Sequence, residues 1–343
     1  MTNLIIKVQD QEENWKFMNT AENRKLKLEN NNNKIEISII IVCMNNLINL
    51  FPCIESIINQ TKKNTYEIFA VAYLFSKKNL DLLKFKFPDV IIIESNEIRG
   101  FSENNNLALC QAKGKYCFVL NDDTIMNMPV VDLLAESFDK EPSASFMSPK
   151  TVFGNGRLQS CGRPPITIWT YLLSAMKMWN EQKIKSKYIN QKGIFQSYNI
   201  VGAAFMVKSN IFKELGYFDE TYFFCPEDIA LSTLANRKGY KCFVNESITL
   251  VHLEGGTAKK IQSATYPAAI KGMILFLGST YLKKMLICGI IFFEISFKWV
   301  YWSLNSSSQN RKLNMKKLSN SFKALFINQS PKEIFTKYYQ KIK

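Results

Sequence analysis

The sequence predicts an α/β fold, with a mainly parallel, Rossmann-like sheet, helices on both faces and a helical C-terminal extension. Two observations carry this prediction. Runs of β-branched residues long enough for buried strands alternate with segments whose apolar residues recur at helical spacing. In addition, 47% of the 343 residues are hydrophobic, which is enough to bury one large core or two modest ones. Alternation of strand and helix implies right-handed crossovers and therefore parallel neighbours.

The first part of the chain contains four predicted strands with helices between them. The strands are expected at "IEISIIIVCM", "YEIFAVAYLF", "DVIIIES" and "KYCFVLN". The helices are expected at "NLFPCIESIINQT", "NLDLLKFKF" and "SENNNLALCQAK", the last ending at Gly114. Ligands of such sheets bind at the carboxyl ends of the strands, where this chain carries Asn45, Ser95 and the run "NDDT" from Asn121 to Thr124.

Beyond Pro129 the pattern is more mixed. A helix is expected at "VVDLLAESF" and a strand at "ASFMSPKTVF", and a variable segment covers residues 169–192. A strand at "YNIVGAAFMVK" follows, and then a helix from Ser209 to Gly216, a helix at "DIALSTLANRKG" and a strand pair within "KCFVNESITLVHL".

The two ends of the chain differ in residue composition from this middle part. Residues 1–35 are polar, contain the run "NNNN", and are expected to form a tail. Residues 261–343 are expected to be helical, and the aromatic stretch "MILFLGSTYLKKMLICGIIFFEISFKWVYW" is interrupted by charged residues. Its uninterrupted part is shorter than the ~20 residues of a spanning helix. We therefore expect helices that lie on the inner membrane face, with packing on the main domain or a homodimer contact as the alternative.

Charge and cysteine usage limit the partners and the compartment. A net charge of +15 suggests an anionic partner such as a nucleotide or an acidic membrane surface, although a lysine-rich solvated surface explains it equally well. Binding of nucleic acid is not expected, because the chain lacks an interleaved basic and aromatic module. Eight cysteines without a C-x-x-C pair, and the lack of a signal peptide, favour the cytoplasm.

Two acidic groups stand out as candidates for chemistry. In "FVLNDDT", neighbouring carboxylates at a strand end repel each other unless a cation lies between them, which favours Mg²⁺ or Mn²⁺ bridging a diphosphate. An Asn-Asp turn is the alternative.

His252, the single histidine, ends an apolar strand before Gly255-Gly256 and would lie beside these acids in a continuous sheet. Glu227 and Asp228 follow Pro226 in the first turn of a helix, where acids also favour the helix dipole.

In their order along the chain, these segments resemble a family 2 glycosyltransferase of the GT-A fold, in its rhamnosyltransferase-like branch. The resemblance covers residues 37–257 and includes "SIIIVCMNN", "IRGFSENNNLALCQAKGKYCFVLNDDT", "NIVGAAFMVK", "GYFDETYFFCPEDIALSTLANRKGYK" and "VHLEGGT". It implies a GT-A glycosyltransferase domain over residues 36–260. It also implies inverting transfer of a sugar from a nucleotide-sugar donor to a hydroxyl of a glycan or lipid-linked acceptor, in cell-surface polysaccharide biosynthesis.

The resemblance also implies roles for individual residues. Asp228 falls at the position of the catalytic base, and Glu227 at that of an acceptor-binding acid. Asp123 and His252 fall at metal-binding positions for Mg²⁺ or Mn²⁺. The positions that contact the donor are Cys43, Asn45, Asn106, Asn121 and Asp122.

The chain departs from the family pattern on the nucleoside side. An acid is usual after the second strand, where this chain has Ala72, and Cys43 and Met44 replace the usual Thr and Tyr. After Asp228, Ala230 and Leu234 replace an Asp and an Arg. These differences keep a second hypothesis open, a catalytically weakened homologue that binds a saccharide or a partner enzyme.

Overall fold

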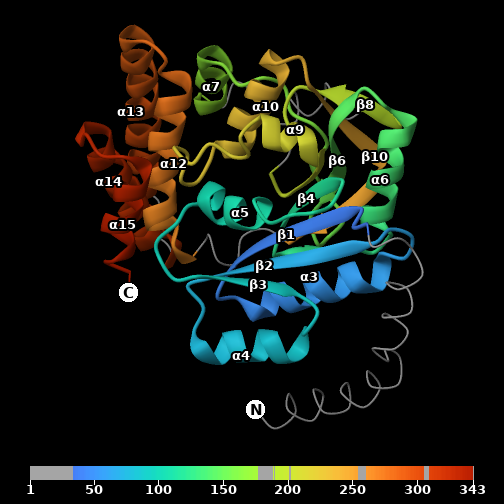
Figure 1. Cartoon of the computed structure of the whole chain (residues 1–343). Coiled ribbons are helices and arrows are strands. Elements are labelled where there is room, and N and C mark those ends of the chain that lie inside the picture. Colours follow the sequence, from blue (N-terminus) through green and yellow to red (C-terminus); the bar gives the residue numbers. More distant parts are fainter. Residues whose placement is uncertain are drawn as a thin grey trace.

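The structure, a computed structural model, describes residues 34–176, 188, 190–200, 202–253, 260–304 and 309–342. Residues 1–33 of the expected tail and the expected Gly255–Gly256 loop lie outside the described residues. Within them, one ten-stranded sheet forms the centre of the molecule, in the order β3-β2-β1-β4-β9-β6-β10-β5, with β7 added to β6 and β8 to β10 (Figure 1).

The strands and helices have the following bounds. The strands are β1 Ile37–Met44, β2 Tyr66–Tyr73, β3 Ile91–Ser95, β4 Tyr116–Asn121, β5 Thr124–Ile125, β6 Ala144–Val152, β7 Leu158–Ser160, β8 Ile194–Ser197, β9 Ala204–Lys208 and β10 Lys241–His252. The helices are α3 Leu47–Gln60, α4 Lys77–Lys86, α5 Phe101–Leu109, α6 Val130–Lys140, α7 Ile168–Ala175, α9 Ser209–Glu214, α10 Glu227–Arg237, α12 Gln262–Leu277, α13 Tyr281–Leu304, α14 Gln309–Phe326 and α15 Pro331–Tyr339.

The predicted α/β fold with helices on both faces is confirmed. Strands β3, β2, β1 and β4 run parallel, β9 is antiparallel to both of its neighbours, and β6 and β10 are parallel again. Alternate residues of β1 enter different cores, as the period of two in a strand requires. Ile39 and Ile41 pack with α3, α4 and α6, whereas Ile40 packs with α5, α9 and α10.

Three element boundaries differ from the sequence prediction. Helix α5 ends at Leu109, not at Gly114. Gly114 instead permits a close approach to β1, since a Cβ atom there would lie 2.4 Å from the Ser38 backbone nitrogen. Strand β9 begins only at Ala204. The expected strand pair is one strand, β10, which follows β6 on both sides of a register shift between Asn245 and Thr249.

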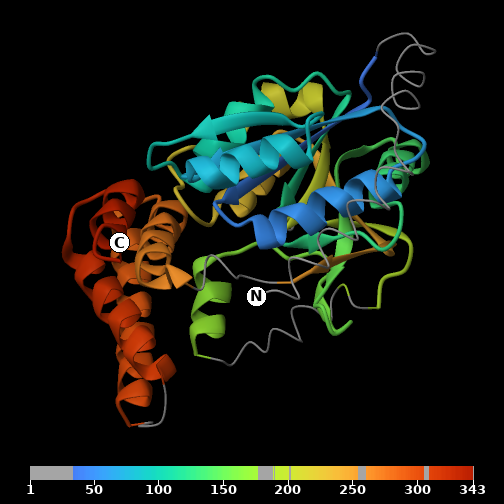
Figure 2. The same cartoon turned by 90° about the horizontal axis from the view of Figure 1, so that it is seen from below.

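The C-terminal helices lie beside the sheet domain (Figure 2) and contain an apolar core of their own. Helix α13 has 24 residues and a mean hydropathy of 1.5 in its most apolar window, so by length and composition it could cross a membrane. The helix reaches this length by continuing through Glu294 and Lys298, which divide the apolar stretch in the sequence. Its inner face is buried at Ile287, Ile291 and Ile295, and α12 and α14 pack against it.

Candidate active site

The end of β4 meets the end of β10 through the short strand β5. Thr124 of β5 pairs with His252, the last residue of β10. This pairing brings His252 Nε2 to 3.1 Å from Asp123 Oδ1. The Asn121 side-chain nitrogen lies 3.4 Å from the same ring nitrogen. His252 thus meets Asp123 and Asn121 at one edge of the sheet, although Asn121 and His252 are 131 residues apart in the sequence.

The Asp123–His252 pair has the chemistry of a divalent-cation site. A carboxylate with an imidazole nitrogen suits Mn²⁺, and carboxylates with water suit Mg²⁺. Ligands at adjacent corners of an octahedron with bonds of about 2.1 Å lie about 3 Å apart, close to the observed 3.1 Å. Among the described residues, no group of three or more His, Cys, Asp or Glu side chains could hold an ion.

Gln159 of β7 orients the ring of His252. Gln159 Oε1 lies 2.8 Å from His252 Nδ1, so this ring nitrogen donates its proton and a neutral ring turns the Nε2 lone pair toward Asp123. The Nε2 lone pair of His252 and the Asp123 carboxylate oxygen are then both acceptors, and their close contact requires a proton or a metal ion between them. Because β7 is a three-residue strand without a motif, the sequence contained no signal for Gln159.

Replacing Gln159 with alanine is expected to weaken binding of Mn²⁺ alone by about 10- to 100-fold, because the ring loses the partner that fixes its orientation. Titration of free Mn²⁺ by electron paramagnetic resonance measures this affinity without any turnover. Gln159→Glu keeps an acceptor at the same position and is the matched control. Equal affinities of Gln159→Ala and the unsubstituted protein would show that the ring is oriented by other contacts.

One carboxylate oxygen of Asp122 is left without a partner. Asp122 Oδ2 is buried and has no hydrogen-bond partner in the described part of the chain. Burial raises the pKa of Asp122 to about 7; the Cys43 thiol opposes this rise, and the charge of Asp123 adds to it. A nearby cation or a donor hydroxyl would satisfy such an oxygen. Cys43 and Asp122, both predicted to contact the donor, are therefore neighbours in the structure.

Asn45 and Asn106, also predicted to contact the donor, have their side chains engaged within the protein. Asn45 Oδ1 accepts a hydrogen bond from the Ser76 N–H at 3.1 Å and so joins the end of β1 to the start of α4. Asn106 is buried, and its side-chain nitrogen donates to the Phe218 carbonyl oxygen and to Glu220, both at 2.9 Å. These contacts position loops at the sheet edge, and direct contact of either residue with a donor stays a prediction.

Asp228 lies in the first turn of α10, as the sequence predicted, and its carboxylate is fixed by two backbone donors. Asp228 Oδ1 accepts the Ile229 N–H at 2.8 Å, and Oδ2 accepts the Gly202 N–H at 3.0 Å. The side chain is only 9% exposed. Each carboxylate oxygen keeps a second lone pair, so Asp228 can accept a further hydrogen from a substrate in a defined direction.

Gly202 and Ala203 join the Asp228 helix to the acidic end of β4. Asp228 accepts the Gly202 N–H, and the Ala203 carbonyl oxygen accepts the Asn121 N–H at 3.0 Å. A Cβ atom on Gly202 would lie 2.8 Å from Asp228 Oδ2, so only glycine permits this approach. The candidate base therefore contacts Gly202, and the end of β4, two residues before Asp123, contacts the neighbouring Ala203. Gly202 belongs to the quoted motif "NIVGAAFMVK", yet no role was predicted for it.

Glu227 and Arg163 flank Asp228. The Cys225 N–H donates to Glu227 Oε2. Burial, followed by the charge of Asp228, raises the pKa of Glu227 well above its usual range. Arg163 Nη1 lies 3.7 Å from Asp228 Oδ2 with 44% of its side chain exposed, so the pair adds little stability. Arg163 instead places a cation beside the base; the backbone bridge between Arg163 and Asn199 brings it there.

The aromatic segment before α10 is held by three other helices. The Phe223 carbonyl oxygen lies only 2.3 Å from the position of a Cβ atom on Gly100, at the start of α5. The ring of Phe223 packs on Phe335 of α15, with centroids 4.5 Å apart. On α12, a Cβ atom on Gly272 would lie 2.3 Å from the Cys225 carbonyl oxygen. The C-terminal helices thus help to position the helix that carries Asp228.

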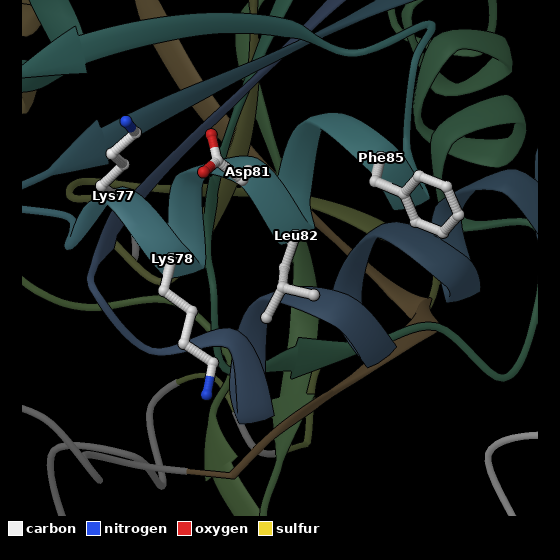
Figure 3. A pocket seen from close by; sticks show the side chains of 5 residues that line it. All are labelled: Lys77, Lys78, Asp81, Leu82 and Phe85. Atoms are coloured by element: carbon white, nitrogen blue, oxygen red, sulfur yellow. The ribbon is translucent and has the colours of Figure 1, made fainter.

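Two surface hollows are lined by other residues. One lies along the outer face of α4, and Figure 3 shows that its five lining side chains come from that single helix. The other is lined by Tyr188, Gln191 and the segment Phe195–Tyr198. None of the predicted site residues lines either hollow. The meeting of β4, β10 and α10 is therefore the candidate active site.

The chain is similar in sequence and in fold to known proteins. Residues 38–216 match the family described as Glycosyl transferase family 2. Over 243 residues the chain is 22% identical to the O-antigen biosynthesis protein RfbC of Myxococcus xanthus; the match covers 67% of this chain but only 18% of that protein. The structure of GalNAc-T7 with UDP, GalNAc and Mn²⁺ matches with a TM-score of 0.52 at 16% identity, covering 64% of this chain and 43% of the other. The mannosyltransferase PcManGT of Pyrobaculum calidifontis, solved with GDP-Man and Mn²⁺, matches with a TM-score of 0.47 at 14% identity, over 90% and 80% of the two chains.

Proposed function

Because the chain belongs to glycosyl transferase family 2, we propose that it transfers a sugar, with inversion, from a nucleotide-sugar donor to a hydroxyl of a glycan or lipid-linked acceptor. One observation carries the proposal: Asp228 accepts the Gly202 N–H, and the Ala203 carbonyl oxygen accepts the N–H of Asn121, two residues before the Asp123 that pairs with His252. The finer assignment is a hexosyl or rhamnosyl transfer in cell-surface polysaccharide biosynthesis. The similarity to the O-antigen biosynthesis protein of Myxococcus supports it.

In the proposed reaction Asp228 is the general base. The acceptor hydroxyl gives its proton to the Asp228 carboxylate as its oxygen attacks the anomeric carbon of the donor sugar. The bond between that carbon and the diphosphate oxygen breaks, and its electron pair leaves with the nucleoside diphosphate. The backbone hydrogen bonds to Asp228 hold the carboxylate in place during the transfer.

Asp123 and His252 would hold a divalent cation in this reaction, with Asp122 beside them. When bound, Mn²⁺ or Mg²⁺ would neutralise the charge that develops on the departing diphosphate. GalNAc-T7, which shares the fold of this chain, was solved with both UDP and Mn²⁺, and this supports the choice of cofactor. Gln159 keeps the His252 ring turned toward the cation.

Glu227 has a different part in the proposed reaction. Its raised pKa means that it keeps a proton at a higher pH than an ordinary glutamate does. A protonated carboxyl group donates a hydrogen bond, so Glu227 can bind an oxygen of the acceptor next to Asp228. Because the environments of the two adjacent acids differ, Glu227 can bind the acceptor while Asp228 acts as the base.

The cytoplasm is the proposed compartment. All eight cysteines are free, and most are buried, as expected in a reducing environment. The thiols of Cys43 and Cys53 lie close to the candidate cation site, and burial raises the pKa of both. Such protonated thiols are poor nucleophiles and poor metal ligands, so the proposed cation site depends on the carboxylates and the histidine.

Hydrolysis of nucleotide sugars, measured with Mn²⁺ and again with EDTA, is the direct test of the proposed function. We expect turnover of at least one donor with Mn²⁺ and its loss with EDTA, because the diphosphate charge is then no longer neutralised. A thermal-shift screen of the same donors with Mn²⁺ identifies the nucleotide, since a ligand that binds the folded state raises the melting temperature. Binding of a donor without any metal-dependent turnover would contradict the proposal.

One observation favours the second hypothesis, a catalytically weakened homologue that binds a saccharide or a partner. Ala72, at the position of the expected nucleoside acid, is buried. Met44 and Leu74, at the ends of β1 and β2, pack against the apolar cluster of the C-terminal helices. At these positions the nucleoside would meet apolar side chains instead of the expected acid. The EDTA comparison decides between the hypotheses, because only the first requires metal-dependent turnover.

A further inference from the structure

Helix α13 presents a continuous apolar stripe to solvent. Leu282, Leu286, Phe293, Phe297 and Leu304 are 76%, 54%, 73%, 69% and 78% exposed. Their spacing by multiples of three or four residues places them along one side of the helix. Exposed apolar surface of this extent marks an interaction site in a folded protein.

The charged residues of α13 do not interrupt this stripe. Glu294 has only 12% of its side chain exposed; it pairs with Lys298 and accepts a hydrogen bond from the Tyr171 hydroxyl of α7 at 3.1 Å. Lys298 also lies 3.5 Å from the Tyr266 hydroxyl of α12. The two charges that divide the segment in the sequence are therefore turned toward the neighbouring helices. The outer face remains apolar beyond the lysines at its start.

The chain around α13 is strongly basic. Residues 261–343 contain thirteen lysines and arginines but only two acids, Glu294 and Glu333. Within the described residues, the exposed lysines of α13 and α14 are Lys283, Lys284, Lys312, Lys316 and Lys323. An apolar and aromatic stripe bordered by basic side chains complements an anionic membrane surface, where lysines contact headgroups and rings enter the interface.

Packing indicates that α13 lies along a membrane and does not cross it. Its inner side is closed by α12 and α14, with Ile287 and Ile291 fully buried. If α13 entered the hydrocarbon with these contacts intact, α14 would follow with Lys312 and Lys316. Charged side chains within the bilayer are costly, whereas an amphipathic helix at the interface leaves them in water.

We infer that the outer stripe of α13, continued by α7, binds the headgroup region of an anionic bilayer and turns the Asp228 side of the enzyme toward it. Helices α7 and α13 lie side by side in Figures 1 and 2, and Trp169 on α7 is 64% exposed. Helix α12 contacts both α13 and, at Gly272, the segment just before α10. The stripe faces away from α12, so α13 itself and α12, each about 10 Å across, lie between the stripe and the start of the catalytic helix.

This arrangement deepens the proposed function by selecting the acceptor class, and for that part it rests on the proposed function. An acceptor attached to a membrane lipid would meet the enzyme on the side where Asp228 lies. A free glycan would gain nothing from the stripe. Membrane binding through α13, α14 and α7 does not depend on catalysis.

Flotation of the full chain with vesicles tests the surface. Phosphatidylcholine vesicles with about a third phosphatidylglycerol should carry the protein upward, and neutral vesicles or high salt should reduce the bound fraction severalfold. The double variant Phe293→Glu/Phe297→Glu should lower partitioning to anionic vesicles by about tenfold or more. Trp169→Glu should lower it severalfold. Phe85→Glu on α4, where Phe85 is 82% exposed, is the matched control and should bind as the unsubstituted protein does.

Any of the following three results would contradict the inference. If Phe85→Glu lowered vesicle binding as much as Phe293→Glu/Phe297→Glu does, the binding would be non-specific adsorption. Resistance of native membrane binding to alkaline carbonate would mean that α13 spans the bilayer. A dimer in light scattering that the double variant dissociates, without vesicle binding, would assign the stripe to a second copy. Circular dichroism establishes that each variant is folded, and no nucleotide sugar enters the assay, so its failure leaves the proposed transferase reaction untouched.

Discussion

Asp228→Asn is expected to reduce sugar transfer by about 10³-fold or more, because the amide cannot take the proton of the acceptor hydroxyl. The amide nitrogen would also face an N–H group, since both Asp228 oxygens accept backbone hydrogen bonds, so some loss of stability is expected as well. Initial rates of transfer measure the first effect and thermal unfolding the second. Donor binding with Mn²⁺ should change little, which separates loss of the base from loss of the site.

Glu227→Gln is the control for this substitution. Glu227 lies next to Asp228 in the same helical turn, and its raised pKa indicates a protonated side chain near neutral pH. Glutamine resembles that protonated form, so we expect a transfer rate within about tenfold of the unsubstituted enzyme. If Glu227→Gln were as inactive as Asp228→Asn, or if Asp228→Asn retained most of its activity, Asp228 would not be the sole base.

Asp123→Asn is expected to lower metal-dependent turnover by about 10²- to 10³-fold, because a neutral amide is a weaker ligand and leaves the cation held mainly by His252. The distance of 3.1 Å between Asp123 and His252 is the basis of this expectation. Turnover against Mn²⁺ concentration measures it, and a high concentration of Mn²⁺ should restore part of the rate. Mn²⁺ titration without donor should show the same weakening.

Asp81→Asn on α4 removes the same charge from an exposed position outside the site. It should leave both the Mn²⁺ affinity and the turnover unchanged. An Asp123→Asn enzyme with unchanged Mn²⁺ affinity would exclude Asp123 as a ligand and leave Asp122 as the acid to examine.

The meeting of Asp123 with His252 could be foreseen because Asp123 follows one buried strand and His252 ends another. Strand ends are readable in the sequence, and the ends of strands in one continuous sheet share an edge. The first turn of α10 was equally readable, since proline followed by two acids is a common helix start. In each case the predictive pattern lies within one short segment of the sequence. A regular sheet then suffices to bring the strand ends together.

Gln159, Gly202 and Arg163 could not be foreseen, because their positions depend on contacts between distant segments. Gln159 lies on a three-residue strand 93 residues before the histidine that it orients. Gly202 matters only because the Asp228 carboxylate approaches it from another element. The environment of Glu294 and Lys298 depends on similar distant contacts, because Tyr171 and Tyr266 of neighbouring helices lie beside these two side chains.

The contact between Gly272 and Cys225 has a consequence for building chimeric enzymes. At this point the backbone of α12 meets the backbone just before α10 with no space for a side chain. Grafting the last eighty residues of a relative onto this chain would therefore shift the base unless the graft kept that glycine and a partner for Phe223. Recombination among such enzymes should exchange the loop and the C-terminal helices as one block.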